Sequence, residues 1–175
     1  MLDLVIEGTR KDLGGGVSLS LIHEIHLAQE LLGPAQKVFC VLNHERLDLG
    51  VDAVADFMIQ HRAGAVSHIH LDLLQRPAQR RGILSFERGW IDYDLTRNQV
   101  NSQVEGEGRT NVWDDPDFDT NQPYLSEMAT FLDYVREGRV RHEHDAWQAA
   151  QSLATVVAGF ESAVSGCAAN VRNFS

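Results

Sequence analysis

Apolar residues recur at helical spacing over residues 17–32 and define the first helix that we expect. Three glycines at positions 14–16 precede this stretch, and the pair Gly33–Pro34 ends it. Glycine adopts positive φ and lets another group come close, so we expect a tight turn that a ligand could approach. The buried stripe of the helix, repeating every three or four residues, is Val17, Leu21, Ile25, Ala28 and Leu32.

Shorter apolar runs predict strands on either side of that helix. Residues 2–6 alternate between apolar and polar and predict a strand that ends at Gly8, within a first strand and linker over residues 1–12. A short turn at 87–89 predicts an antiparallel hairpin between the last two of the later strands. These later strands are expected at 37–43, 54–61, 65–74, 82–86 and 90–94.

Two more helices are expected after a polar loop at 101–119. The first has a stripe running from Tyr124 to Val135 through Met128, Phe131 and Leu132. The stripe of the second is Ala149, Leu153, Val156, Phe160 and Ala163. Strands that cluster between helices, rather than alternating with them, favour an α+β fold. We therefore expect one domain over residues 1–175, an open, mainly antiparallel β-sheet with helices packed on one face.

The strand at 54–61 is partly apolar on both sides. Val54 and Met58 fall on one side, and Ala55, Phe57 and Ile59 on the other. Helices on one face alone would leave the second side in water, so we expect that face to meet another subunit. The resulting assembly would be a homodimer or an even-numbered homo-oligomer. A strand buried on both sides within one domain is the alternative.

Composition limits the classes of partner. The formal net charge of −10, with only two lysines, argues against nucleic acid, because phosphate binding needs a basic face. Cys40 and Cys167 are too few for a disulfide framework, so we expect a cytoplasmic protein. No apolar run reaches the roughly 18 residues of a membrane span, and we expect no membrane partner.

Candidate chemistry concentrates in the helix after the glycines. His23 and His26 are three residues apart, so both rings can lie on one side of the helix. An imidazole is suited to exchanging a proton with a bound hydroxyl near neutral pH. Ser20, three residues before His23, could donate or accept a hydrogen bond there. A lone histidine on a helix is, however, more often structural.

Metal and anion sites are weaker alternatives. The helix has H-E-x-H rather than the H-E-x-x-H of zinc proteases, and His68, His70 and Asp72 share one strand face. With eight histidines in the chain, chance spacing explains both zinc candidates. Arg76, with two further arginines at positions 80 and 81, could grip a carboxylate or phosphate, although a solvated loop is the commoner explanation.

The segment GGGVSLSLIHEIH at residues 14–26 resembles the start of the second domain of the Gfo/Idh/MocA oxidoreductases, typically GGGVLLDLIHEID. This chain has Ser20 and His26 where the family usually has aspartates. Residues 71–95, 118–139 and 145–166 are similar to later elements of that domain, in the same order. The resemblance implies that His23 is the catalytic residue, and we expect Ser20, His26 and Arg76 to bind the substrate.

The resemblance also implies what a complete enzyme would contain. No G-x-G-x-x-G turn follows a strand, and neither Lys11 nor Lys37 lies in the E-K-P motif of the family's nucleotide domain. We therefore expect this chain to hold no cofactor and to be inactive alone. It would be the substrate-binding and oligomerisation domain of an NAD- or NADP-dependent enzyme acting on a sugar or sugar-derived substrate. The nucleotide-binding domain would come from the same gene or a partner chain.

Two other classes of function stay open. The chain could be a non-catalytic assembly module that pairs with a separate nucleotide-binding protein. Less in keeping with its motifs, it could be a metal-dependent enzyme that uses its histidines.

Overall fold

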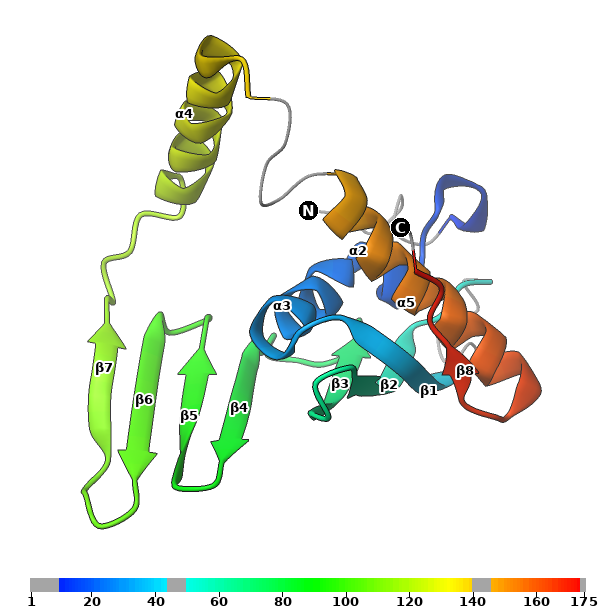
Figure 1. The fold of residues 1–175 in the computed structure, drawn as a ribbon, viewed down its shortest axis with the longest axis horizontal. Coiled ribbons are helices and arrows are strands. Elements are labelled where there is room, and N and C mark those ends of the chain that lie inside the picture. The colour runs from blue at the N-terminus through cyan, green and yellow to red at the C-terminus, as the bar shows by residue number, and fades with distance from the viewer. Residues whose placement is uncertain (1–9, 44–49, 140–145, 174–175) are drawn as a thin grey trace. The chain divides into compact units, whose positions relative to one another are not determined.

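The computed structural model describes residues 10–43, 50–139 and 146–173, which form two compact units (Figure 1). Unit 1 contains the described residues up to Leu74 and from Ala146 onwards, and unit 2 starts at Gln75. The strand expected at residues 2–6 lies outside the described residues. The predicted α+β class with antiparallel strands is confirmed, and the described strands form two four-stranded sheets.

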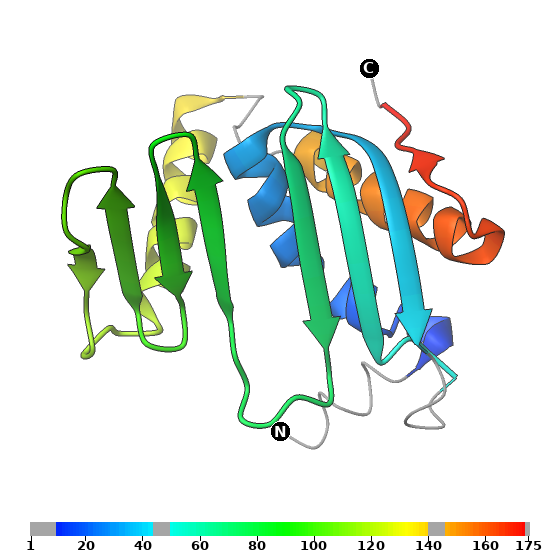
Figure 2. The same cartoon turned by 90° about the horizontal axis from the view of Figure 1, so that it is seen from below.

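Unit 1 has helices packed on one face of an antiparallel sheet (Figure 2). Its strands, in spatial order, are β3 (Val66–Asp72), β2 (Val54–His61), β1 (Ala35–Asn43) and β8 (Ala169–Asn170). Its helices are η1 (Lys11–Leu13), α2 (Val17–Ser20), α3 (Ile22–Leu32) and α5 (Ala146–Ser165). The three strands expected in this unit are all found, and β2 has the predicted bounds.

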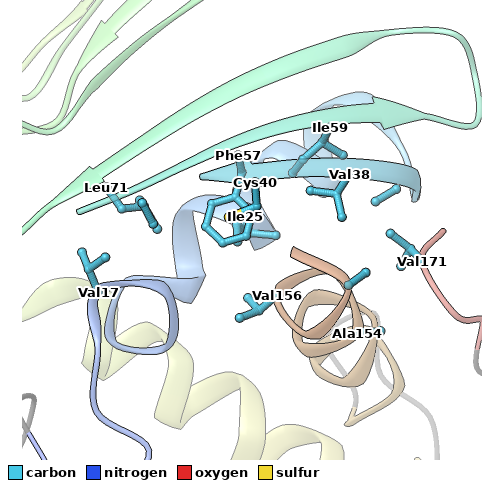
Figure 3. Close-up of a cluster of buried hydrophobic side chains, with 13 residues drawn as sticks. Val17, Ile25, Val38, Cys40, Phe57, Ile59, Leu71, Ala154, Val156 and Val171 are labelled. Carbon is cyan, nitrogen blue, oxygen red and sulfur yellow. The ribbon is translucent and has the colours of Figure 1, made fainter. Parts of the chain in front are cut away.

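The core of unit 1 lies between the sheet and the helices α3 and α5 (Figure 3). Ala55, Phe57 and Ile59 are fully buried there, whereas Met58 is 54% exposed on the opposite face. Because side chains alternate along a strand, these exposures show which side of β2 faces the core and which side is open. The core face carries Phe57, and the open face carries Met58.

The helix expected over residues 17–32 is divided into two segments at Leu21. The φ of −109° and ψ of 27° at Leu21 depart from helical values, and α3 begins at the next residue. Val17 and Ile25 are both fully buried, so each segment is anchored in the core by its own apolar side chain. The apolar stripe was therefore predicted correctly, but the break was not.

The glycine turn before α2 has a buried aspartate as its partner. Gly14 and Gly16 have positive φ values of 75° and 115°. The Oδ2 atom of Asp52 accepts hydrogen bonds from the Ser18 N–H at 2.8 Å and the Ser18 hydroxyl at 2.6 Å. The Val17 N–H donates to the Asp52 carbonyl oxygen at 2.8 Å. A Cβ atom at Gly16 would collide with Oδ1 of Asp52, so this position requires glycine.

Unit 2 is an antiparallel meander followed by one helix. Its strands, in spatial order, are β4 (Arg81–Phe86), β5 (Gly89–Asp94), β6 (Gln99–Val104) and β7 (Thr110–Asp114). The helix is α4 (Gln122–Glu137). The hairpin expected between β4 and β5 is confirmed, with Phe86 paired to Gly89.

The polar loop expected at 101–119 was wrong, because β6 and β7 occupy much of it. Polar residues in these strands pair with the neighbouring strand: the Asn101 side chain, for example, donates a hydrogen bond to Asp92 of β5 at 3.0 Å. A segment with so few apolar residues can still form a strand, because its main chain pairs with an adjacent strand of the sheet. None of the helices in the described parts of the chain is long and apolar enough to cross a membrane.

We predict that Asp52→Ala lowers the free energy of unfolding by about 1–3 kcal/mol, because it removes the acceptor of two buried donors on Ser18. Asp52→Asn should cost less, since its amide oxygen still accepts a hydrogen bond. Urea unfolding followed by circular dichroism measures both effects. Asp12→Ala is the matched control: Asp12 pairs with Arg10 on the surface, and its loss should change stability by less than about 0.5 kcal/mol. Equal effects at positions 52 and 12 would contradict the capping role.

Candidate active site

His23 lies on the first turn of α3, and its side chain is 48% exposed. Its Nε2 atom is 3.2 Å from Oε1 of Glu24, so a carboxylate adjoins the ring. Ile25, two residues further on, is fully buried and holds this turn of the helix against the core. The arrangement presents an imidazole to solvent from a rigid support, as a group that exchanges protons with a bound molecule requires.

His26 lies beside a cavity between α3 and α5 that is open to solvent and lined mainly by residues with polar side chains. The cavity has a volume of about 220 Å³. The Nδ1 atom of His26 is 3.1 Å from the hydroxyl oxygen of Ser152, which also accepts a hydrogen bond from the Gln29 side chain at 3.2 Å. His23 is not among the residues that line this cavity, which are His26, Gln29, Glu30, Pro34, Gln148, Gln151 and Ser152.

The other two residues expected to bind the substrate lie elsewhere. Ser20 is exposed at the end of α2, before the break at Leu21, and its N–H donates to the Gly16 carbonyl at 2.9 Å. Arg76 is an exposed residue of unit 2, whereas His23, Ser20 and His26 belong to unit 1. A guanidinium nitrogen of Arg76 donates to the Gln75 carbonyl at 2.8 Å. Unit 1 thus holds three of the four predicted site residues.

The glycine turn does not fit the pyrophosphate of a dinucleotide. Such a group binds where a helix presents unpaired N–H groups and no competing anion. At α2 the N–H groups of Val17 and Ser18 already donate to Asp52, whose carboxylate occupies the close approach beside Gly16. The ligand-approachable turn that the glycines predicted is therefore filled by the chain's own side chain.

The remaining histidines of the described sheet have protein partners. His61 is buried, with Nδ1 2.6 Å from the Gly33 carbonyl oxygen and Nε2 2.9 Å from the Ser67 hydroxyl. His68 and His70 both contact Asp56, whereas the spacing along the strand had indicated Asp72 as their partner. Across residues 10–43, 50–139 and 146–173, no three His, Cys, Asp or Glu side chains are arranged to hold a metal ion.

Cys40 is a structural rather than a reactive residue. Burial raises the pKa of its thiol to about 12, and the negative charges of Asp52 and Asp56 act in the same direction. The thiol therefore stays protonated near neutral pH, where a nucleophile would need to be a thiolate.

Comparison with solved structures identifies the fold. A levoglucosan dehydrogenase in complex with NADH and levoglucosan matches with a TM-score of 0.82 and 16% identity, covering 91% of this chain and 51% of that one. An aldose-aldose oxidoreductase from Caulobacter crescentus matches with a TM-score of 0.76 and 17% identity over 90% of this chain and 48% of that one. An NAD binding oxidoreductase from Klebsiella pneumoniae matches with a TM-score of 0.80 and 14% identity, covering 96% of this chain and 54% of that one.

The chain thus spans about half the length of the solved structures that it matches. No curated protein matches its sequence. Residues 7–92 match the family described as the GFO/IDH/MocA C-terminal domain, and this stretch contains the glycine turn, α2, α3, β1 to β4 and the first part of β5. By this match, the chain belongs to the GFO/IDH/MocA family as a C-terminal domain.

Proposed function

We propose that the chain is the substrate-binding and oligomerisation part of an NAD(P)-dependent oxidoreductase that acts on a sugar or sugar-derived substrate. Family membership supports this, as do structural relatives named for levoglucosan and aldose substrates. The observation that carries the proposal is the exposed His23 beside Glu24, on the helix that follows the glycine turn. NAD or NADP would be bound by a nucleotide-binding domain in the same gene or in a partner chain, and this chain alone would not turn over.

His23 would act on the substrate hydroxyl. A nicotinamide cofactor supplies hydride transfer in such enzymes. As a hydroxyl becomes a carbonyl, its proton must leave the oxygen, and the ring of His23 would accept that proton. The Glu24 carboxylate, 3.2 Å away, stabilises the positive charge that the ring then gains. In the reverse direction His23 returns the proton to the oxygen.

Ser20, His26 and Arg76 would orient the substrate. The Ser20 hydroxyl can donate or accept a hydrogen bond but carries no charge, unlike the aspartate that the family resemblance places there. His26 borders a cavity whose amide, hydroxyl and carboxylate groups suit a polyhydroxylated molecule. Arg76 would bind a carboxylate on an acidic sugar.

Self-association would use the open face of the sheet in unit 1. Large apolar side chains there are exposed, among them Val41 at 53%, Met58 at 54% and Val66 at 64%. Apolar residues gathered on one sheet face favour a protein partner over water. We propose a homodimer or an even-numbered homo-oligomer. The two free cysteines, Cys40 and Cys167, support a reducing compartment such as the cytoplasm.

An assembly module without catalytic activity is the second candidate. It is favoured by Ser20 and His26, which replace two aspartates of the family string, because a carboxylate beside the catalytic ring would be missing at position 20. Such a module would pair with a separate nucleotide-binding protein and leave the chemistry to it.

We predict that His23→Ala lowers kcat by roughly 100- to 10,000-fold in the enzyme completed by its nucleotide-binding half, the usual contribution of a positioned acid or base. The melting temperature should change little, because the side chain is half exposed. Ser20→Asp should leave kcat unchanged or raise it. His61→Ala is the matched control: it removes a buried, hydrogen-bonded ring and should lower stability while sparing kcat in the folded fraction.

Full turnover in a folded His23→Ala variant would remove His23 from the mechanism. If no nucleotide-binding half restores activity to the wild-type chain, the assembly module becomes the better account.

We predict that Met58→Asp converts the assembly to monomers, because a charge would then be buried between copies. Light scattering measures the mass at matched concentrations. Phe57→Asp is the contrasting variant: Phe57 is buried in the core, so it should unfold the chain rather than yield a folded monomer. A wild-type monomer at high micromolar concentration would contradict the proposed interface.

A further inference from the structure

The cavity between α3 and α5 offers a set of hydrogen-bonding groups that does not include His23. Its lining residues come from α3, from Pro34 just after that helix, and from the first half of α5. All three stretches belong to unit 1, so one compact unit defines the cavity. Its volume of about 220 Å³ is below the roughly 300–1,000 Å³ of pockets for drug-sized ligands. A molecule that fills it would be small, about the size of one sugar ring.

The side chain of Gln29 has a fixed orientation at this cavity. Its Oε1 atom accepts a hydrogen bond at 3.3 Å from the main-chain N–H of Ala35, which is buried. Because a main-chain N–H can only donate, the amide oxygen must point towards Ala35 and the amide nitrogen away from it. That nitrogen donates to the Ser152 hydroxyl at 3.2 Å. The bonds of Gln29 to described residues thus use one of its two amide hydrogens, and the second can bind a ligand hydroxyl.

Ser152 connects the two helices at the cavity. It is buried, and its hydroxyl oxygen lies 3.1 Å from Nδ1 of His26 as well as 3.2 Å from the amide nitrogen of Gln29. The hydroxyl can donate its own proton to the main-chain carbonyl of Gln148 at 3.4 Å. One residue of α5 therefore holds two side chains of α3 in place. Groups that are already held in this way lose little freedom when a ligand binds.

Glu30 gives the cavity its negative charge. The described lining contains this one carboxylate and neither lysine nor arginine. The Glu30 side chain is 40% exposed, and its Oε1 atom is 3.9 Å from Nε2 of His26. A carboxylate accepts hydrogen bonds from hydroxyl groups but repels a second negative charge. A ligand in this cavity therefore needs hydroxyl groups, and it should carry no acidic group next to Glu30.

We propose that the cavity binds an uncharged, hydroxyl-bearing part of a sugar, and that Gln29 and Glu30 determine the selectivity for it. The choice of a sugar as the ligand rests on the proposed function. The second amide hydrogen of Gln29 donates to one ligand hydroxyl, and the carboxylate of Glu30 accepts a hydrogen bond from another. The ring of Pro34 adds an apolar surface for the C–H groups of the sugar.

The place of the cavity on α3 suits the part of the sugar that does not react. His26, whose ring borders the cavity, follows His23 by three residues, so the two side chains are neighbours on the surface of the helix. A molecule held in the cavity can therefore extend towards His23. The cavity would bind and orient the ligand, and the proton exchange would be left to His23.

Titration of the ¹⁵N-labelled chain with sugars, followed by ¹H–¹⁵N correlation NMR at pH 7.5, tests this. The uncharged probes are D-glucose, D-galactose and D-mannose, and D-glucuronate is the acidic counterpart of D-glucose. At least one uncharged sugar should shift the side-chain amide signal of Gln29 in a saturable way, with a dissociation constant on the order of millimolar. D-Glucuronate should bind at least about fivefold more weakly than D-glucose, because its carboxylate meets Glu30.

Two variants assign the effect to the proposed residues. Glu30→Gln keeps a hydrogen-bond acceptor without the charge, so D-glucuronate should then bind within about twofold of D-glucose. Gln29→Met has a similar length but no donor, and it should weaken the binding of the uncharged sugars by about tenfold. Glu161→Gln is the matched control, because Glu161 lies on α5 outside the cavity and pairs with Arg172 on the surface. It should leave both affinities unchanged. The dispersion of the main-chain signals checks that each variant is folded.

The outcomes separate this inference from the proposed function. The inference is overturned if none of the three uncharged sugars shifts the Gln29 signal at concentrations up to about 100 mM. Equal affinity of the wild-type chain for D-glucose and D-glucuronate overturns it as well, and so does a folded Gln29→Met variant with undiminished binding. In each of these cases a completed enzyme that depends on His23 leaves the proposed function standing. Sugar binding with the expected selectivity, in a chain that no nucleotide-binding half makes active, supports the cavity and overturns the proposed catalysis.

Discussion

The buried carboxylate of Asp52 is the contact on which the candidate site depends. It joins the segment before β2 to the start of α2 through two hydrogen bonds from Ser18, and Gly16 is needed because Asp52 occupies the place of a side chain. This contact fixes where the helical segments begin relative to the sheet. The position of His23 on α3, one short segment later, follows from it. The triple-glycine motif suggests a ligand-binding turn, but here it forms a structural contact between the start of α2 and Asp52.

The alternation of side chains in β2 links the core to the proposed interface. Phe57 and Ile59 point into the layer of α3 and α5, and Met58 between them faces away from the helices. The open face thus receives both apolar side chains and Asp56 from one strand. The proposed proton exchange at His23 and the proposed self-association through the sheet would consequently use different surfaces of unit 1. Each surface can be altered by substitution without removing the core.

The order of neighbouring residues was enough to predict the helices and strands in which apolar residues recur at a regular spacing. The stripe through Val17 and Ile25 and the alternation of β2 are properties of neighbouring residues, and the structure confirms both. The strands β6 and β7 were missed because their polar residues resemble a loop until a neighbouring strand pairs with them.

Contacts between distant residues were not accessible from spacing alone. Asp52 lies 34 positions from Ser18, and nothing near either residue indicates the other. The break at Leu21 follows from separate anchoring of two segments, which is a tertiary effect. The pairing of Asp56 with His70 had a possible signal: aligning the two predicted strands as a hairpin places them opposite each other.

Calorimetric titration of the chain with NAD⁺, NADH and their phosphorylated forms tests the central claim most directly. If the Asp52 carboxylate occupies the glycine turn and takes its N–H groups, no nicotinamide dinucleotide should give measurable heat of binding. A micromolar dissociation constant for any of them would show a cofactor site within this chain and would contradict its assignment as the substrate-binding part of a larger enzyme.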